Sequence, residues 1–134
     1  MKRVFQTRHF SRWLKKTELS IEALCKAVEE MERGLIDANL GGGIIKKRIA
    51  LPGRGKRGST RTLVATNNAN RWFFLFGFEK SERDNISDKE LIALKALAAD
   101  LLHMSTAQLE AAVAEKTLLE ICHESQDTRQ KSNS

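Results

Sequence analysis

The sequence predicts one α+β domain, in which a small antiparallel sheet of three or four strands carries helices packed on one face. A length of 134 residues suits a single hydrophobic core. Strand-like alternation dominates residues 44–79, and segments with helical spacing precede and follow it. The order strand, helices, three-strand meander, helices is typical of α+β domains. We expect the domain to span residues 1–124 and a disordered polar tail to occupy residues 125–134.

The N-terminal part is expected to form a strand and then helices. Residues 4–10 predict a short first strand, and a short helix or turn follows near residues 10–14. A longer helix is predicted from Ser20, which suits the N-cap position, because apolar residues recur at helical spacing as far as Leu35. These apolar residues are Ile21, Leu24, Cys25, Val28, Met31 and Leu35.

Three more strands are predicted after a run of three glycines, at residues 44–51, 60–66 and 71–79. Pro52 ends the first of these strands, and a flexible basic loop follows it. The run 71–79 is apolar on both faces, which predicts a buried central strand. Its aromatic side chains are therefore interpreted as core residues rather than as a platform on which bases stack.

Two capping boxes mark the helices of the C-terminal part. Ser87 and Glu90 predict the start of a helix that continues to about His103. Ser105 and Gln108 repeat the device before a shorter helix. Both helices carry an apolar stripe that can pack against the predicted sheet.

Several functional classes are excluded by composition. The two cysteines, Cys25 and Cys122, are too few and too far apart for a disulfide scaffold or a metal site, so we expect a small buried residue and an incidental thiol. The three histidines are dispersed, and no metal or other cofactor is implied. No apolar run approaches the ~20 residues that cross a bilayer, and no secretory signal is recognised, so no membrane contact is predicted and the chain is expected in the cytoplasm.

The positive charge of the chain is concentrated in its middle. Residues 41–83 hold ten Lys or Arg against two acidic residues, whereas residues 84–134 hold five against nine. A concentrated basic region is typical of a surface that binds a nucleic acid backbone. We therefore favour nucleic acid as the ligand over a merely solvated surface.

Alternation along the predicted strands indicates where these cations could meet. Lys46 and Arg48 fall on one face of their strand, Arg61 begins the next strand, and Lys80 follows the last one. We expect these four to converge and to act as catalytic groups, stabilising a phosphate attacked by the 2′-hydroxyl of RNA without a metal. Five further cations are predicted to contact RNA: Arg83, Lys47, Arg54, Lys56 and Arg57. Among these, Lys47 falls on the mostly apolar face of its strand.

Three stretches of the sequence, residues 44–50, 58–64 and 76–86, resemble the RelE/HigB-like toxins of type II toxin–antitoxin modules. The resemblance extends over about residues 4–122 and implies a RelE-like fold. It also implies a ribosome-dependent endoribonuclease that cuts mRNA, and a small antitoxin partner, often a helix-turn-helix protein. By motif, Arg61 matches the arginine at the scissile phosphate, and the basic pairs before and after it match the family's other basic residues: Lys46 with Arg48, and Lys80 with Arg83.

The sequence departs from this family pattern in one respect. It contains no tyrosine, and Ser81 and Ser87 stand where some members have arginine and tyrosine. Either Lys46, Arg48 or the loop cations transfer the proton, or cleavage is weak. Two other functions stay open: a non-enzymatic ParE-like toxin that blocks a protein target such as gyrase, and a basic nucleic-acid-binding module without toxicity.

Overall fold

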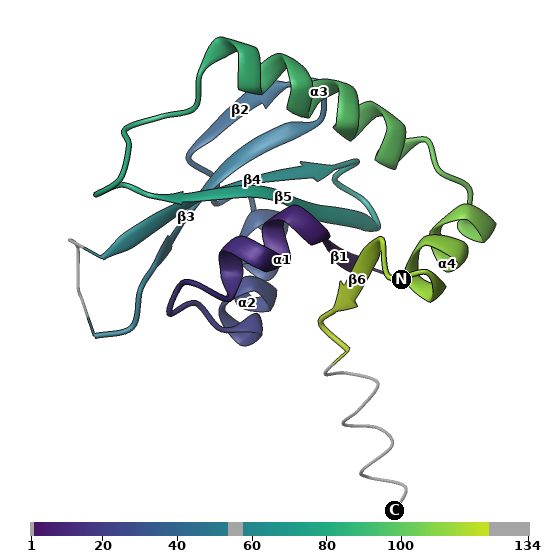
Figure 1. The fold of residues 1–134 in the computed structure, drawn as a ribbon, viewed down its shortest axis with the longest axis horizontal. Helices are drawn as coiled ribbons and strands as arrows, with labels where there is room; N and C mark the ends of the chain where they lie inside the picture. Colours follow the sequence, from purple (N-terminus) through teal and green to yellow (C-terminus); the bar gives the residue numbers. More distant parts are fainter. Residues whose placement is uncertain (1, 54–57, 124–134) are drawn as a thin grey trace, which may run out of the picture.

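A computed structural model describes residues 2–53 and 58–123 and contains one six-stranded sheet with helices on either side (Figure 1). The predicted tail, residues 125–134, and the loop cations Arg54, Lys56 and Arg57 lie outside the described residues. In chain order the elements are β1 (Arg3–Thr7), α1 (Arg8–Leu14), α2 (Ile21–Glu32), β2 (Ala38–Gly41), β3 (Ile44–Ala50), β4 (Ser59–Thr66), β5 (Arg71–Glu79), α3 (Asp88–Leu102), α4 (Thr106–Ala114) and β6 (Leu118–Ile121). None of the helices in the described part of the chain is long and apolar enough to cross a membrane.

The α+β class is confirmed, but the sheet is larger than predicted and is mixed. Its strand order is β2-β3-β4-β5-β1-β6, with β1 parallel to β5 and the other pairs antiparallel. The prediction of three or four antiparallel strands is therefore wrong. The two strands that it missed, β2 and β6, contain only four residues each, which is too short to give a clear alternation.

Helices cover both faces of the sheet, so the prediction of helices on one face is also wrong. On one side, which we call the α2 face, α1 and α2 cover a cluster that includes Val64, Trp72 and Phe74. On the other, the α3 face, α3 and α4 cover a second cluster that includes Leu63 and Phe73. Figure 1 shows α3 on one side of the sheet and α1 and α2 on the other. The physical reason is that β5 is apolar on both sides, and each side must be shielded from water.

The helix starts follow their capping residues closely. Ser20, Ser87 and Ser105 are the N-caps of α2, α3 and α4, and the last two form the predicted capping boxes. The predicted first strand is too long, because the Thr7 hydroxyl accepts a hydrogen bond from the Phe10 backbone and starts α1 there. The predicted first long helix ends early, at Glu32, because the chain turns into a left-handed conformation soon after it.

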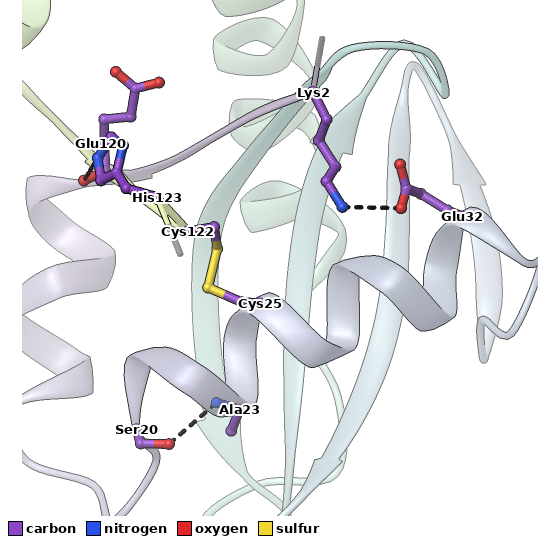
Figure 2. The surroundings of a disulfide bond; sticks show 8 residues. All are labelled: Lys2, Ser20, Ala23, Cys25, Glu32, Glu120, Cys122 and His123. Carbon is purple, nitrogen blue, oxygen red and sulfur yellow. Dashed lines mark hydrogen bonds and ion pairs between the residues drawn. A yellow bond between two sulfur atoms is a disulfide. The ribbon is translucent and has the colours of Figure 1, made fainter. Parts of the chain in front are cut away.

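The two cysteines form a disulfide, which corrects the expectation of a buried residue and a free thiol. Cys25 on α2 and Cys122 just after β6 have Cα atoms 5.5 Å apart, although they are separated by 97 positions in the chain (Figure 2). The pairing depends on β6 adding to the edge of the sheet beside β1. Since the sequence did not predict β6, it could not place Cys122 next to α2.

Helix α1 packs closely against β5 on the α2 face. A Cβ atom added to Gly77 would lie 2.4 Å from Cζ3 of Trp13, so the ring occupies the space above that glycine. Gly77 is opposite Thr62, a fully buried residue of β4. This contact fixes α1 beside the half of β5 that extends beyond β1.

Candidate functional site

A group of cations lies at the end of the α3 face that α3 leaves uncovered. Arg48 is directly opposite Arg61 in the β3–β4 pair, and Lys46 is opposite Leu63. Residues directly opposite in adjacent strands share a face, so these cations point to the same side as the apolar residues beneath α3. The structure thus brings together three of the four residues that were predicted to act in catalysis, Lys46, Arg48 and Arg61.

The uncovered end is defined by where α3 crosses the sheet. Its later part lies over the turn that precedes β3, since Lys95 and Leu102 are the nearest side chains to Gly42 and Gly43. The beginning of β3 and the end of β4 are therefore buried, as Ile44 shows with no exposed surface. The opposite end, where Arg48 is exposed and Arg61 is half-buried, stays open.

The cations of this open end have no acidic partner in the described part of the chain. The Arg61 guanidinium donates from Nη1 to the Ser59 hydroxyl at 3.0 Å, and Ser59 is itself buried. Residues 2–53 and 58–123 place no carboxylate in an ion pair with Lys46, Arg48 or Arg61. Like charges directly opposite in a sheet are destabilising, so an anion bound between Arg48 and Arg61 would relieve their repulsion.

Arg83 reaches the same face from the link between β5 and α3. Its guanidinium carbon lies 5.6 Å from the ring centroid of Phe76 and 5.9 Å from that of Phe78. These two rings are opposite Leu63 and Arg61 in the β4–β5 pair. Stacking on aromatic rings leaves the planar guanidinium free to donate hydrogen bonds along its edge.

The position of Arg83 is fixed by Glu90 in the first turn of α3. Nη1 of Arg83 donates to Oε1 of Glu90 at 2.8 Å, and the Ser87 backbone donates to the same oxygen at 2.8 Å. The hydrogen bond from Arg83, followed by those from Ser87, lowers the pKa of Glu90 to about 2. One carboxylate therefore completes the capping box of α3 and orients a cation at the site.

Lys80 lies at the end of β5, close to the first residue of β4. Its backbone N–H donates to the Ser59 carbonyl at 3.4 Å, and its side chain is exposed. The Ser59 hydroxyl accepts a hydrogen bond from Arg61, so Ser59 contacts both Arg61 and the backbone of Lys80. Lys80 therefore lies near the cations of the open end.

Lys47 does not belong to this group, which corrects its selection as an RNA contact. It lies on the α2 face and is buried, with Nζ 2.9 Å from Oε1 of Glu30 and donating to the Leu35 carbonyl at 2.9 Å. The alternation of β3 accounts for this position, because its neighbours Lys46 and Arg48 point to the opposite side. Its ion pair joins α2 to β3.

Two aromatic features of the site were not recognised in the sequence. Phe76 is half-buried and forms part of the floor beneath Arg83, whereas the apolar pattern of residues 71–79 predicts a core side chain at this position. His9 stacks on Phe76 with ring centroids 5.5 Å apart and an interplanar angle of 8°. Strict alternation in β5 would put Phe76 on the face opposite to Phe73 and Leu75, but the register shift between Leu63 and Val64 brings it to their side, and only the fold brings His9 there. Among the described residues, no group of three His, Cys, Asp or Glu side chains is placed to hold a metal ion.

Comparison with known proteins identifies a family. A family model described as "RelE toxin of RelE / RelB toxin-antitoxin system" matches residues 2–121. No curated protein matches the chain. The family match extends from the start of β1 to the end of β6 and includes all of the cations described above. The chain therefore belongs to the RelE toxin family and is a toxin of a toxin–antitoxin system.

Proposed function

We propose that this protein is a ribosome-dependent endoribonuclease that cuts mRNA and binds the scissile phosphate between Arg48 and Arg61. The observation that carries the proposal is the gathering of Lys46, Arg48 and Arg61, without acidic partners in the described residues, at the uncovered end of the α3 face. Membership of the RelE toxin family supports it, because RelE toxins are generally mRNA-cleaving.

The reaction that suits this arrangement is attack by the 2′-oxygen of RNA on the adjacent phosphorus. A bond forms from the 2′-oxygen to phosphorus and the bond to the 5′-oxygen breaks, which leaves a cyclic phosphate and a 5′-hydroxyl. The transition state places extra negative charge on the phosphoryl oxygens, and the two guanidinium groups can donate hydrogen bonds to it. The Ser59 hydroxyl acts as a positioning group, because it accepts a hydrogen bond from Arg61.

Two protons must move in this reaction, one from the 2′-hydroxyl and one to the leaving 5′-oxygen. The chain has no tyrosine, so we assign this work to the lysines of the site. Lys46 lies on the same face as Arg48, and Lys80 lies beside the start of β4. We assign the binding of a neighbouring phosphate to Arg83, which is held on its aromatic floor.

The test is cleavage of mRNA on purified ribosomes, with the new 5′ ends mapped by primer extension. The wild-type protein should produce new ends, and Arg61→Ala should slow their formation roughly 100- to 1,000-fold, as the loss of one charge-stabilising donor does in other enzymes. Arg33→Ala is the matched control, because this exposed arginine at the end of α2 makes none of the contacts described for the site and should leave cleavage unchanged. Circular dichroism should show the same fold in all three proteins.

Two results would contradict the proposal. Equal cleavage by Arg61→Ala would show that the phosphate binds elsewhere. Growth arrest by the wild-type protein without new 5′ ends would instead favour a ParE-like toxin that blocks a protein target.

The family also implies an antitoxin, and we propose a small helix-turn-helix protein as this partner. Co-expression with a small protein encoded beside the toxin should abolish the growth arrest. Copurification of the two proteins through size-exclusion chromatography would confirm a direct complex.

A further inference from the structure

A second basic surface lies on α1, outside the residues discussed above. Arg12, Lys15 and Lys16, on α1 and just after it, are exposed, and α1 itself contains no acidic residue. Within the described ranges no carboxylate forms an ion pair with any of the three. A helix surface that only keeps a protein soluble normally mixes charges of both signs, so this surface resembles a binding site for an anion.

These cations border a cavity of about 540 Å³ between α1 and β5. We call it the α1 pocket; its lining combines three cations with three flat rings, namely Arg12, Lys15, Lys16, His9, Trp13 and Phe76. None of the described residues that line it is acidic. Cations that alternate with aromatic rings are the usual composition of a groove for single-stranded nucleic acid.

His9 gives the pocket a stacking surface that is already in place. Its imidazole lies nearly parallel to the Phe76 ring, at 8°, with centroids 5.5 Å apart, and the residue is exposed. A ring stacked on one side and exposed to water can take a nucleobase on the other side. The tight contact of Trp13 with Gly77 holds α1, and with it His9, against β5.

Phe76 connects this pocket with the cations of the α3 face. It is opposite Leu63, which is opposite Lys46, so the three residues form one row across three strands. With strands about 4.8 Å apart, the row from Lys46 to Phe76 spans only about 10 Å. Arg83 lies over the same Phe76 ring. An RNA strand with its scissile phosphate at Arg48 and Arg61 could therefore continue across Phe76 to α1.

We propose that the α1 pocket is a second subsite for single-stranded RNA, in which one base stacks on His9 and the adjoining phosphates bind Arg12, Lys15 and Lys16. The inference rests on the proposed function, because the pocket would bind a further part of the RNA strand that the proposed reaction cleaves at the α3 face. The base is bound by its flat face and not by its edge, so the subsite accepts any base. Its contribution is to hold the strand, and no residue of it transfers a proton.

The test measures binding of a short fluorescent single-stranded RNA of mixed sequence over a range of salt concentrations. Lys15→Gln/Lys16→Gln should weaken binding and reduce the slope of log K against log salt by about 1.4, because two phosphate contacts each contribute about 0.7 in a single strand. Lys2→Gln/Arg33→Gln, which removes the same charge from exposed positions before β1 and at the end of α2, should leave the slope unchanged.

Variants of His9 test the stacking separately from the charge. His9→Ala should weaken binding about tenfold with the salt slope unchanged, because a stacked base is lost and no phosphate contact is. His9→Phe should bind as the wild type does, since a phenyl ring stacks equally well. Two results would overturn the proposal: equal affinities for the wild type and His9→Ala, or equal salt slopes for the Lys15→Gln/Lys16→Gln variant and its control double variant.

Two further comparisons locate the RNA and separate this proposal from the preceding one. Binding of the variants to ribosomes free of mRNA identifies the source of the RNA. A loss of binding only with these ribosomes identifies ribosomal RNA and would overturn the proposal that the cleaved strand occupies the pocket. A loss of binding to the free strand identifies the message and supports it. If Arg61→Ala abolishes cleavage while the α1 variants bind as the wild type does, only the second subsite is refuted. If the α1 variants lose RNA binding but the wild type cuts nothing, only the proposed function is refuted.

Discussion

The two faces of the central sheet use the same strands in opposite ways. On the α2 face, β3 and β4 contribute Ile49, Thr62 and Val64 to a surface that the helices cover. On the α3 face, the same strands contribute Arg48 and Arg61 to a surface that is open at one end. Alternation in β3 thus divides a run of three basic residues between the interior and the uncovered end of the α3 face.

Lys47 shows that the surroundings of a basic side chain determine its role. Its side chain is 10% exposed and its ammonium group is paired with Glu30, which makes it part of the packing between α2 and β3. The neighbouring residues Lys46 and Arg48 have no such partner in the described part of the chain. We therefore expect substitutions on the α2 face to change stability, and those at the uncovered end of the α3 face to change RNA binding and cleavage.

The largest loss of stability is expected on removal of the disulfide, which lies on the α2 side of the molecule. The double variant Cys25→Ser/Cys122→Ser should lower the free energy of unfolding by about 3 kcal/mol, because the bond closes a loop of nearly 100 residues. Urea titration followed by circular dichroism measures this. Cleavage of mRNA below the unfolding transition should not change.

Reducing agent gives the control for this comparison. The wild-type protein should lose stability when it is reduced, and the double variant should not respond. If oxidised and reduced wild-type protein unfold at the same urea concentration, the disulfide does not stabilise the α2 side of the molecule.

Lys47→Ala is expected to lower the free energy of unfolding by about 2 kcal/mol. The cost of removing one partner of a buried ion pair is about 3–5 kcal/mol, and it is reduced here because Glu30 is 30% exposed and can regain water. Arg48→Ala, at the next position, should change stability by no more than about 0.5 kcal/mol but should slow cleavage. The opposite outcome for the pair, with a stable Lys47→Ala and an unstable Arg48→Ala, would reverse our assignment of the two faces.

Gly77→Ala should lower the free energy of unfolding by about 1–2 kcal/mol, which is the usual cost of overpacking. The added methyl group would collide with the Trp13 ring on the α2 face. Trp13→Leu provides space, so the double variant should recover part of the loss in the same urea titration. An additive result would mean that the loss in Gly77→Ala does not come from the Trp13 ring.

The sequence was sufficient for features that depend on local patterns. The apolar run of β5 predicted its central position, and the capping boxes at Ser87 and Ser105 predicted the starts of two helices. Alternation put Lys46 and Arg48 on one face, as the structure does. The same alternation puts Lys47 on the apolar face, although its charge alone predicts a contact with RNA.

The features that the sequence did not indicate depend on contacts between distant segments. Strand β6 belongs to the sheet because it pairs with β1, and the disulfide follows from that pairing. His9 and Phe76 are separated by half of the chain and carry no shared motif, so their stack appears only in the folded protein. The same holds for Arg83, whose aromatic floor belongs to β5.

The smallest effect on stability is expected from Glu90→Gln, which lies beside the uncovered end of the α3 face. The folded pKa of Glu90, about 2, lies below its ordinary value of 4.5. Its stabilising contribution is therefore complete above about pH 4.5 and is lost as the pH falls toward 2. The difference in melting temperature between the wild type and Glu90→Gln should be present at pH 6 and should vanish near pH 2, as calorimetry over this range can measure.

The same substitution also tests whether the Glu90 carboxylate orients Arg83. Glutamine keeps a carbonyl oxygen for the capping box but loses the charge that pairs with the guanidinium. RNA binding should therefore weaken in Glu90→Gln at neutral pH, and Arg83→Ala should weaken it further, because it removes the cation itself. If Glu90→Gln binds RNA as tightly as the wild type while Arg83→Ala does not, the aromatic rings alone position Arg83, and the carboxylate serves only the helix.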